Sequence, residues 1–511
     1  MRLIGKVCSL AVQVLAISLA SPALAEVVNI TLLHLNDVYE ITPVEGKTRG
    51  GLARVATLRQ QLLQKNPHTY TVLAGDFLSP SALGTAKING QPLAGQQMVA
   101  VLNAMGLDFA TFGNHEFDLP ENLFYQRLKE ARFRWFSSNV FDAQGKPFPN
   151  VPQSSIITVK GDNGAVVRVG LIGVTLDSNR PQYVTYRDPI DTVKEQVREL
   201  KNRVDILVVV THLSIEQDQK LAEAVPEIDI IIGGHEHENL QLWRGRDFTP
   251  IFKADANART VYIHNLLYDT ATQRLKINSY IQPVTNEIPD EPNTEKVVKT
   301  WVTQGFEAFR ANGFEPEQAI ATTSVPLDAL EGSVRNRNTN LTTVIAQAML
   351  QEVKGADLAI LNSGSIRIDD IIPPGSITQY DVIRMLPFGG KILAVEMKGN
   401  LLQRVLEQGK ANKGTGGYLQ TANVSQEATT GKWLVAGQLL DINRTYRVAV
   451  NDFLVSGKEK GLDFLNLQQP EIKLIEEKRD IRFAVIDQLR RNTQVPAASH
   501  QPIPVIQPLK G

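Results

Sequence analysis

An apolar run passes directly into glycine and histidine in the segment Ile228-Asp229-Ile230-Ile231-Ile232-Gly233-Gly234-His235-Glu236-His237. Residues 228–232 have the pattern of a short buried strand, and the polar residues begin where that strand would end. Because alternate residues of an extended segment point the same way, His235 and His237 would face a common site. An isolated His-x-His pair is as often structural as functional, so its meaning depends on what accompanies it.

Four earlier segments have the same order, with an apolar run followed by polar residues. They are residues 30–35 before Asn36-Asp37, 72–74 before Gly75-Asp76, 110–112 before Gly113-Asn114-His115-Glu116-Phe117-Asp118, and 207–210 before Thr211-His212. In an α/β sheet the carboxyl ends of the strands share one edge, where ligands bind. Each fragment alone is a weak signal, but together they predict that carboxylate, amide and imidazole groups meet at one place.

Helical patterns lie between several of these runs. Residues 52–63 and 191–203 carry apolar side chains at helical spacing, and residues 168–174 form a further strand pattern. This alternation of strands and helices predicts a layered α/β domain over residues 26–284.

A second α/β region is expected after a linker. Residues 283–292 contain three prolines, and residues 293–311 have a helical pattern. We therefore expect a linker and helix over residues 285–319, a C-terminal α/β domain over residues 320–492, and a loose Pro-rich tail over residues 493–511.

The composition is that of a globular protein. Of the 511 residues 43% are hydrophobic and 21% charged, which excludes a wholly disordered or fibrous chain. Lys and Arg number 53 against 54 Asp and Glu, a formal net charge of -1. Such a balance provides no general attraction to a nucleic acid polymer or an acidic membrane. Any anion must be held by a local site.

The first 25 residues are predicted to be a cleaved secretory signal peptide. Arg2 and Lys6 give a positive start, residues 7–19 are apolar, and Ser21-Pro22-Ala23-Leu24-Ala25 ends in a small-x-small cleavage pattern. The apolar run is short for a bilayer span, so a retained anchor is the lesser alternative. We expect a mature protein from about Glu26, secreted or periplasmic, with no stable membrane anchor.

Cys8 is the only cysteine of the chain and lies within this predicted signal. The mature protein would then have no thiol, which excludes disulfides, cysteine-based zinc sites and cysteine nucleophiles. Metal ligands would have to be histidine, carboxylate, amide or phenol.

These ligand types predict divalent ions of the zinc, manganese or cobalt kind, whereas an all-oxygen set would favour Mg²⁺ or Ca²⁺. Two such ions about 3.5–4 Å apart can clamp the attacking and leaving oxygens of an in-line phosphoryl displacement. They can also supply a hydroxide near neutral pH.

The order of these motifs resembles the calcineurin-like metallophosphoesterases, and more narrowly the secreted 5′-nucleotidase / UDP-sugar hydrolase family. The C-terminal half is similar too: Asn362-Ser363-Gly364-Ser365-Ile366-Arg367 resembles that group's Asn-Gly-Gly-Gly-Ile-Arg segment. Further corresponding segments are Leu386-Pro387-Phe388-Gly389-Gly390, Gly417-Tyr418-Leu419-Gln420, Asn451-Asp452-Phe453 and Gly461-Leu462-Asp463-Phe464. The resemblance covers nearly the whole mature chain and implies an N-terminal metallophosphoesterase sandwich with a C-terminal nucleotide-binding domain.

The resemblance implies two metal ions bridged by Asp76. One ion would take Asp76, Asn114, His212 and His235, and the other would take Asp37, Asp76 and His237. It also implies in-line attack by a metal-bridging hydroxide. His115 would polarise the phosphoryl group or assist the leaving oxygen, with Asp118 holding its imidazole ring; a packing role for His115 is the alternative.

Tyr39 departs from the family pattern. The family usually has Asp-x-His where this chain has Asp37-Val38-Tyr39, so a phenol replaces a ligand. A phenol has a pKa near 10 and binds as phenolate only if the ion displaces its proton. Ligation by Tyr39 would favour iron; the alternative that we favour is a Tyr39 that only packs.

The resemblance also implies substrate-binding residues in the second domain. Phe388 and Phe453 would sandwich a base, three arginines would contact phosphate, and two polar residues would contact the base and ribose. The arginines are Arg335, Arg337 and Arg367, and the polar residues are Asn362 and Asp463. The alternatives are core packing for the phenylalanines, solvated charge for the arginines and turn positions for the polar pair. Ser363 and Ser365 replace two family glycines and could alter the pocket.

We expect a secreted, two-metal 5′-nucleotidase-type phosphohydrolase with a small nucleotide as substrate. One alternative is a phosphodiesterase or pyrophosphatase acting on cyclic nucleotides or nucleotide sugars. Another is a nucleotide-binding protein with weakened catalysis, and a solute-binding protein comes last. The sequence specifies neither the base nor the oligomeric state.

Overall fold

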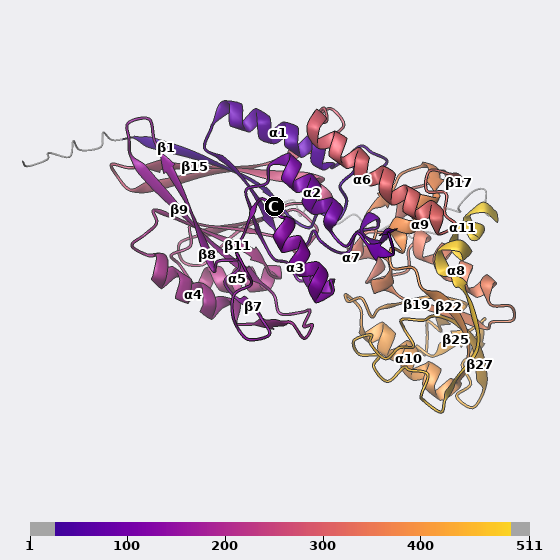
Figure 1. Cartoon of the computed structure of the whole chain (residues 1–511). Helices are drawn as coiled ribbons and strands as arrows, with labels where there is room; N and C mark the ends of the chain where they lie inside the picture. Colours follow the sequence, from indigo (N-terminus) through magenta and orange to yellow (C-terminus); the bar gives the residue numbers. More distant parts are fainter. Residues whose placement is uncertain (1–25, 492–511) are drawn as a thin grey trace, which may run out of the picture.

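The computed structural model describes residues 26–491 and arranges them as two α/β domains connected by the long helix α6 (Pro292–Ala311) (Figure 1). The predicted fold class, with its helical linker, is confirmed. The predicted signal peptide with Cys8 and the predicted tail over residues 493–511 lie outside the described residues.

Two six-stranded sheets form the N-terminal domain. The first has the order β16 (Arg274–Pro283), β15 (Thr260–Asp269), β1 (Val27–Leu35), β2 (Thr69–Ala74), β5 (Phe109–Thr111) and β6 (Arg134–Trp135). The second has the order β13 (Leu240–Arg244), β14 (Thr249–Lys253), β12 (Ile230–Gly233), β11 (Ile206–His212), β9 (Val166–Thr175) and β8 (Ser154–Lys160). The neighbours β1, β2 and β5 are parallel, as are β9, β11 and β12. Their carboxyl ends therefore lie along common edges.

The two sheets pack face to face, and helices cover their outer faces. Along β11, Val208 and Val210 belong to the core between the sheets, whereas Leu207 and Val209 pack with the outer helices. The second sheet is covered by α4 (Pro189–Leu200) and α5 (Ile215–Ala224). The first is covered by α1 (Leu52–Lys65), α2 (Gln96–Met105) and α3 (Glu121–Glu130).

Local hydrogen bonds move two predicted boundaries. The helix expected over residues 191–203 begins at Pro189. The side chain of Asp188 accepts a hydrogen bond from the Asp191 amide at 2.9 Å and caps the helix, and proline is favoured at the first helical position. The strand expected from Ile228 begins at Ile230, because the Ile228 amide donates to the Val225 carbonyl in the turn after α5.

The second domain is built on a five-stranded sheet. Its order is β23 (Leu419–Ala422), β19 (Leu358–Asn362), β27 (Thr445–Asn451), β22 (Lys391–Lys398) and β28 (Ile472–Asp480). One face packs on α8 (Asn340–Glu352) and α11 (Ile481–Arg491), and the other on α10 (Gly399–Ala411). The apolar cluster beneath α8 continues through α6 to the helices α1 and α2, so it spans both domains.

Small elements complete the described chain. They are the hairpin of β3 (Lys87–Ile88) with β4 (Gln91–Pro92), the two-stranded sheets of β7 (Val140–Asp142) with β10 (Val184–Tyr186), β17 (Ala319–Thr323) with β21 (Gly375–Thr378) and β18 (Leu327–Asp328) with β20 (Ile371–Ile372), the three-stranded sheet of β24 (Val424–Gln426), β25 (Trp433–Val435) and β26 (Gln438–Leu439), and the helices α7 (Glu331–Val334) and α9 (Gln379–Met385).

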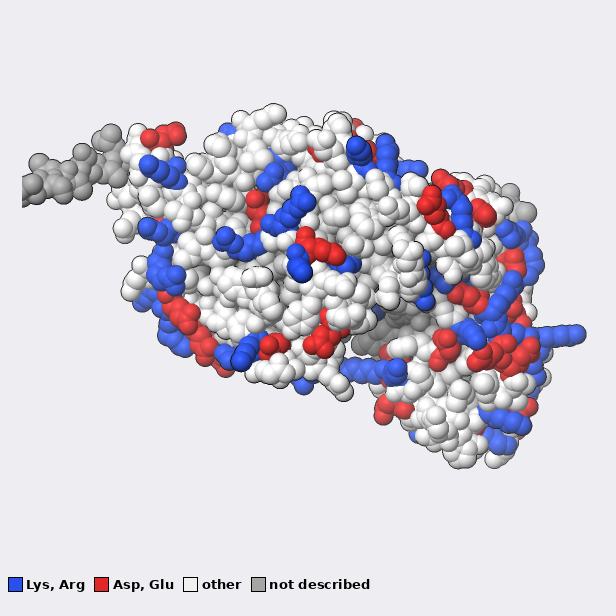
Figure 2. Space-filling model, in the orientation of Figure 1, with Lys and Arg blue, Asp and Glu red and all other residues white. Residues whose placement is uncertain are grey.

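Positive and negative side chains are mixed over the face drawn in Figure 2. This agrees with the near-zero net charge and leaves anion binding to local groups. Within residues 26–491, none of the helices has the length and hydropathy needed to cross a bilayer.

Candidate metal centre

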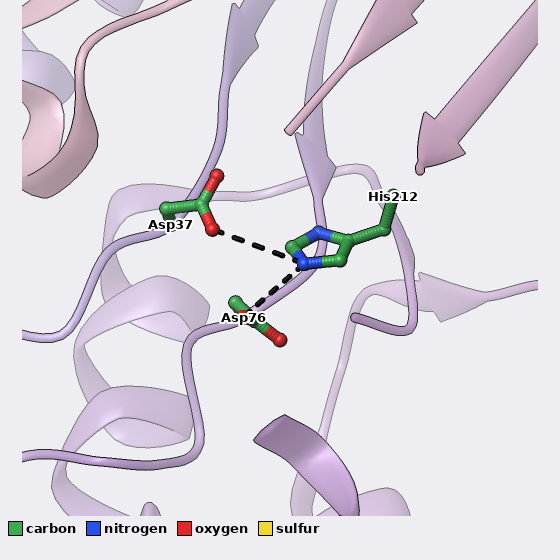
Figure 3. Close-up of side chains that lie close together, drawn as sticks. All are labelled: Asp37, Asp76 and His212. Carbon is green, nitrogen blue, oxygen red and sulfur yellow. Dashed lines mark ion pairs between the residues drawn. The ribbon is translucent and has the colours of Figure 1, made fainter. Parts of the chain in front are cut away.

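Asp37, Asp76 and His212 meet where β1, β2 and β11 end, although they come from three distant parts of the chain (Figure 3). Nε2 of His212 lies 3.2 Å from Oδ2 of Asp76 and 3.9 Å from Oδ1 of Asp37. All three side chains are buried, and their ligand atoms lie within 4.8 Å of one another. The predicted convergence of these three residues is therefore present in the fold.

His212 is oriented as a metal ligand would be. Its Nδ1 faces the Ala74 carbonyl at 2.8 Å and donates to it, so Nε2 points at the carboxylates. Nε2 is buried without a hydrogen-bond partner. Burial lowers the pKa of His212, but the carboxylates of Asp76 and Asp37 outweigh it and raise the pKa to about 9. This position favours a positive charge.

The backbone at four predicted ligands is in the left-handed region. The φ angles are 52° at Asp37, 56° at Asp76, 85° at His235 and 59° at His237. Such a conformation costs a residue with a Cβ roughly 1–2 kcal/mol, and strain of this kind is concentrated at functional sites. A Cβ on Gly234 would lie 2.5 Å from the Ala74 carbonyl oxygen, so glycine is needed for this close approach.

His235 and Asn114 supply further groups without competing partners. The His235 ring lies 5.4 Å from the His212 ring, and its backbone amide donates to Asp37 Oδ2 at 2.8 Å. Burial lowers the pKa of His235 to about 3, so its imidazole is neutral. The Asn114 side-chain oxygen is buried and has no hydrogen-bond partner. Neutral imidazole and a free amide oxygen are the forms that bind metal.

The Tyr39 hydroxyl has polar partners at the candidate centre. Its hydroxyl donates to Asp76 Oδ2 at 3.1 Å and lies 3.0 Å from His237 Nε2. It also lies 3.4 Å from Asp37 Oδ1. The buried phenol hydroxyl therefore lies among the side-chain atoms that would hold the ions. Ligation itself stays a prediction.

The His237 ring is hydrogen-bonded to a carboxylate of the second domain. Its Nδ1 lies 2.8 Å from Oδ2 of Asp369, and its Nε2 lies 3.5 Å from Oδ1 of Asp37. No sequence pattern singles out Asp369, since 132 residues separate it from His237. The only available signal is its position two residues after Arg367.

Glu116, in the segment Gly113-Asn114-His115-Glu116, received no role in the sequence analysis. Its carboxylate accepts hydrogen bonds from the backbone amides of Asp76, Phe77 and Leu78 at 2.9, 2.7 and 3.1 Å. It is fully buried. Glu116 therefore fixes the loop that carries Asp76.

His115 and Asp118 form the predicted pair. His115 Nδ1 lies 2.7 Å from Oδ2 of Asp118, which also accepts from Ser79 Oγ at 3.1 Å. Asn179 Nδ2 donates to the other oxygen of Asp118 at 2.6 Å. Burial lowers the pKa of His115, but the Asp118 and Asp76 carboxylates raise it above its usual value. The ring is fixed and its Nε2 is available.

Arg367, Phe388 and Phe453 are accessible at the edge of the second domain. Arg367 lines a small recess with Tyr39 and His237, and its guanidinium carbon lies 5.8 Å from the centre of the Phe388 ring. Phe388 is 55% exposed and Phe453 is 43% exposed. Such exposure argues against the core-packing alternative.

The other predicted substrate residues are engaged elsewhere or exposed. Arg335 pairs with Glu331, and Arg337 pairs with Asp328 at 2.8 Å. Asn362 is buried, and its amide donates to Glu459 at 2.7 Å. The Asn362 side-chain oxygen accepts from Ser365 and Asn451, so it is saturated within the domain. Asp463 is exposed. Their assignment as substrate contacts stays a prediction.

Comparison with family models identifies this arrangement. A model of the calcineurin-like phosphoesterases matches residues 30–239, and a model of the 5′-nucleotidase C-terminal domain matches residues 319–466. The chain belongs to the calcineurin-like phosphoesterases that carry a 5′-nucleotidase C-terminal domain. It is therefore an enzyme of the metal-dependent phosphoesterase class.

Two relatives and one solved structure illustrate this phosphoesterase family. The chain is 28% identical to a 5′-nucleotidase of Vibrio cholerae, over 84% of this chain and 85% of that protein. It is 27% identical to the trifunctional nucleotide phosphoesterase protein YfkN of Bacillus subtilis, over 84% of this chain but only 32% of that longer protein. The crystal structure of a 5′-nucleotidase precursor from Thermus thermophilus covers 93% of the chain and is itself covered to 98%, with a TM-score of 0.74 and 24% identity. That last similarity concerns the fold.

Calcineurin-like phosphoesterases use divalent metal ions, and the residues present fit such ions. The fit rests on the unpartnered Nε2 of His212, the unpartnered amide oxygen of Asn114 and the closely spaced carboxylates of Asp37 and Asp76. The set combines nitrogen and oxygen donors, as zinc, manganese and cobalt prefer.

Proposed function

We propose that this protein is an exported 5′-nucleotidase-type phosphohydrolase that holds two divalent ions and releases phosphate from nucleotides. One observation carries the proposal: the buried Asp37–Asp76–His212 cluster lies beside the fixed His115–Asp118 pair, since the His115 amide donates to Asp76 Oδ1 at 2.8 Å. A metal site alone needs no such pair. A phosphoryl transfer site needs a group that can exchange a proton with the leaving oxygen.

Asp76 would be shared by the two ions. Asn114, His212 and His235 would complete one ligand set, and Asp37 with His237 the other. When bound, the ions would supply an activated nucleophile and neutralise charge on the phosphoryl oxygens. Glu116 would keep Asp76 in place through the loop amides that it binds.

The second domain would bind the rest of the nucleotide. Arg367 is placed near Tyr39 and His237 and offers a planar set of donors that suits phosphate oxygens. Phe388 and Phe453 present exposed rings on which a base can stack. His115 would stabilise or protonate the leaving ribose oxygen, with Asp118 setting the orientation of its ring.

Export is supported by the signal pattern of the first 25 residues, and nucleotide substrates are supported by the names of the relatives. Together they favour a role in nucleotide catabolism outside the cytoplasm.

The test is metal analysis of the purified protein, followed by measurement of phosphate release and chromatographic identification of the products from a panel of substrates, because cleavage of a cyclic nucleotide or of a nucleotide sugar releases no free phosphate. The panel contains nucleoside 5′-mono-, di- and triphosphates, a nucleotide sugar and a 2′,3′-cyclic nucleotide. We expect two ions per chain and fastest release from a nucleoside 5′-phosphate. Faster turnover of the cyclic nucleotide or of the nucleotide sugar would replace the proposal with the phosphodiesterase or pyrophosphatase alternative. Tight nucleotide binding without turnover would support the alternative of a nucleotide-binding protein with weakened catalysis.

A further inference from the structure

One hydrogen bond joins the second domain directly to the candidate metal centre. Oδ2 of Asp369 lies 2.8 Å from Nδ1 of His237, and Asp369 is only 7% exposed. Because a carboxylate accepts hydrogen bonds, Nδ1 carries the proton in this contact. Nε2 of His237 is then the atom that faces Asp37 and the hydroxyl of Tyr39.

Asp369 is itself held firmly in position. Its Oδ1 accepts a hydrogen bond from the Glu331 amide at 2.7 Å, and an Arg259 guanidinium nitrogen lies 3.9 Å from its Oδ2. Its φ angle is 38°, a left-handed conformation that a residue with a Cβ rarely adopts. A strained and buried carboxylate with defined partners is suited to orienting another group.

The two halves of the centre differ in where their histidines are anchored. His212 is anchored by the Ala74 carbonyl, within the N-terminal domain. His237 is anchored by a side chain of the other domain. One half is therefore complete in the N-terminal domain, whereas the other depends on how the second domain is docked.

We propose that Asp369 is a positioning residue through which the second domain completes the half of the metal centre that contains His237. The proposal rests on the dinuclear site proposed above. A carboxylate that binds the outer nitrogen of a ligand histidine fixes its tautomer and ring and raises metal affinity. Since coupling is reciprocal, an ion bound at His237 also stabilises the docking of the segment that carries Asp369.

Asp370 offers a matched control in the same segment. It is buried, and its Oδ2 accepts from Arg384 at 2.8 Å and from the Glu45 amide at 3.2 Å. It therefore contributes to the same domain contact, because Glu45 belongs to the N-terminal domain, but it has no contact with His237. Asp370→Asn changes the interface and leaves the His237 bond in place.

The experiment compares the wild type with Asp369→Ala, Asp369→Asn and Asp370→Asn, each as the full protein. Stepwise Mn²⁺ and Zn²⁺ affinities are measured by calorimetry with chelator competition. We expect Asp369→Ala to weaken one of two ions about 10- to 100-fold and to leave the other unchanged. Asp369→Asn keeps an acceptor oxygen and should lie between Asp369→Ala and the wild type. Asp370→Asn should bind both ions as the wild type does.

Hydrogen exchange supplies a readout other than activity. Adding Mn²⁺ to the wild type should slow exchange of backbone amides in residues 366–372, and this protection should be lost in Asp369→Ala. If folded Asp369→Ala binds both ions with wild-type affinity, or if Asp370→Asn loses the same ion equally, Asp369 does not position His237. If Asp369→Ala does not fold, wild-type affinity in Asp369→Asn together with unchanged protection overturns the inference. A wild type that binds fewer than two ions would overturn the proposed function as well, which separates the two failures.

Discussion

The hydroxyl of Tyr39 donates a hydrogen bond to Oδ2 of Asp76 at 3.1 Å, so a phenol lies at the carboxylate that two ions would share. The same hydroxyl lies 3.0 Å from Nε2 of His237. We therefore expect Tyr39→Phe to weaken one ion roughly tenfold, the equivalent of about 1.4 kcal/mol, and Tyr39→His to restore tight binding. Metal titrations of the two variants measure this. An iron(III)-loaded wild type with a visible phenolate band that disappears in Tyr39→Phe would indicate direct ligation. Unchanged affinity in Tyr39→Phe would return Tyr39 to a packing role.

Removal of metal should abolish phosphate release. Asp37, Asp76 and His212 are buried and closely spaced, and without an ion they supply no activated nucleophile. Dialysis against a chelator followed by a colorimetric phosphate assay should give a rate at background. Addition of Mn²⁺, Co²⁺ or Zn²⁺ should restore the rate. Full turnover in protein shown to be metal-free would rule out the dinuclear mechanism.

His115→Ala should lower kcat by about 10²–10⁴, the usual contribution of a positioned acid or base. Both ions should remain bound, because the imidazole is held by Asp118 and not by the carboxylate cluster. Steady-state kinetics and metal analysis of the same sample measure the two effects. His68, at the opposite end of β2 from Asp76, is the matched control, and His68→Ala should be neutral. Parallel loss of metal and activity in His115→Ala would make His115 a ligand.

Phe388→Ala and Phe453→Ala should weaken nucleotide use about 5- to 150-fold in kcat/KM, the effect of losing roughly 1–3 kcal/mol of stacking. Hydrolysis of p-nitrophenyl phosphate should change much less. Because the rings are 55% and 43% exposed, the melting temperature should stay near that of the wild type. Equal losses on both substrates together with a lower melting temperature would favour core packing.

Lys253→Met should destabilise the N-terminal domain by about 3–5 kcal/mol, because it leaves a buried carboxylate unpaired. Nζ of Lys253 lies 2.9 Å from Oδ2 of Asp218 and donates to the Leu213 carbonyl at 2.6 Å, with both charged side chains fully buried. Urea unfolding followed by tryptophan fluorescence measures the change. The double variant Lys253→Met/Asp218→Leu should recover much of the loss, and a single variant as stable as the wild type would contradict the assigned ion pair.

The local sequence pattern predicted most of the strands and helices and the three central candidate ligands. Continuous apolar runs predict β11 and β12 as strands buried on both faces, and the helical period predicts which face of α1 and α4 packs on the sheets, because burial follows from the pattern of apolar side chains. The strand-end rule then brings Asp37, Asp76 and His212 together, since parallel neighbours such as β1 and β2 must end at the same edge.

Only the tertiary structure determined which hydrogen-bond partners the polar side chains have. Asp369 reaches His237 across 132 residues, and Tyr39 turns its hydroxyl toward Asp76. The side chain of Asn362 donates a hydrogen bond to Glu459 and accepts hydrogen bonds from Ser365 and Asn451. The physical reason is that a hydrogen bond requires two atoms to lie within about 3 Å at a suitable angle. Spacing along the chain determines which face a side chain occupies, but only the packing of sheets and domains determines which partner it meets.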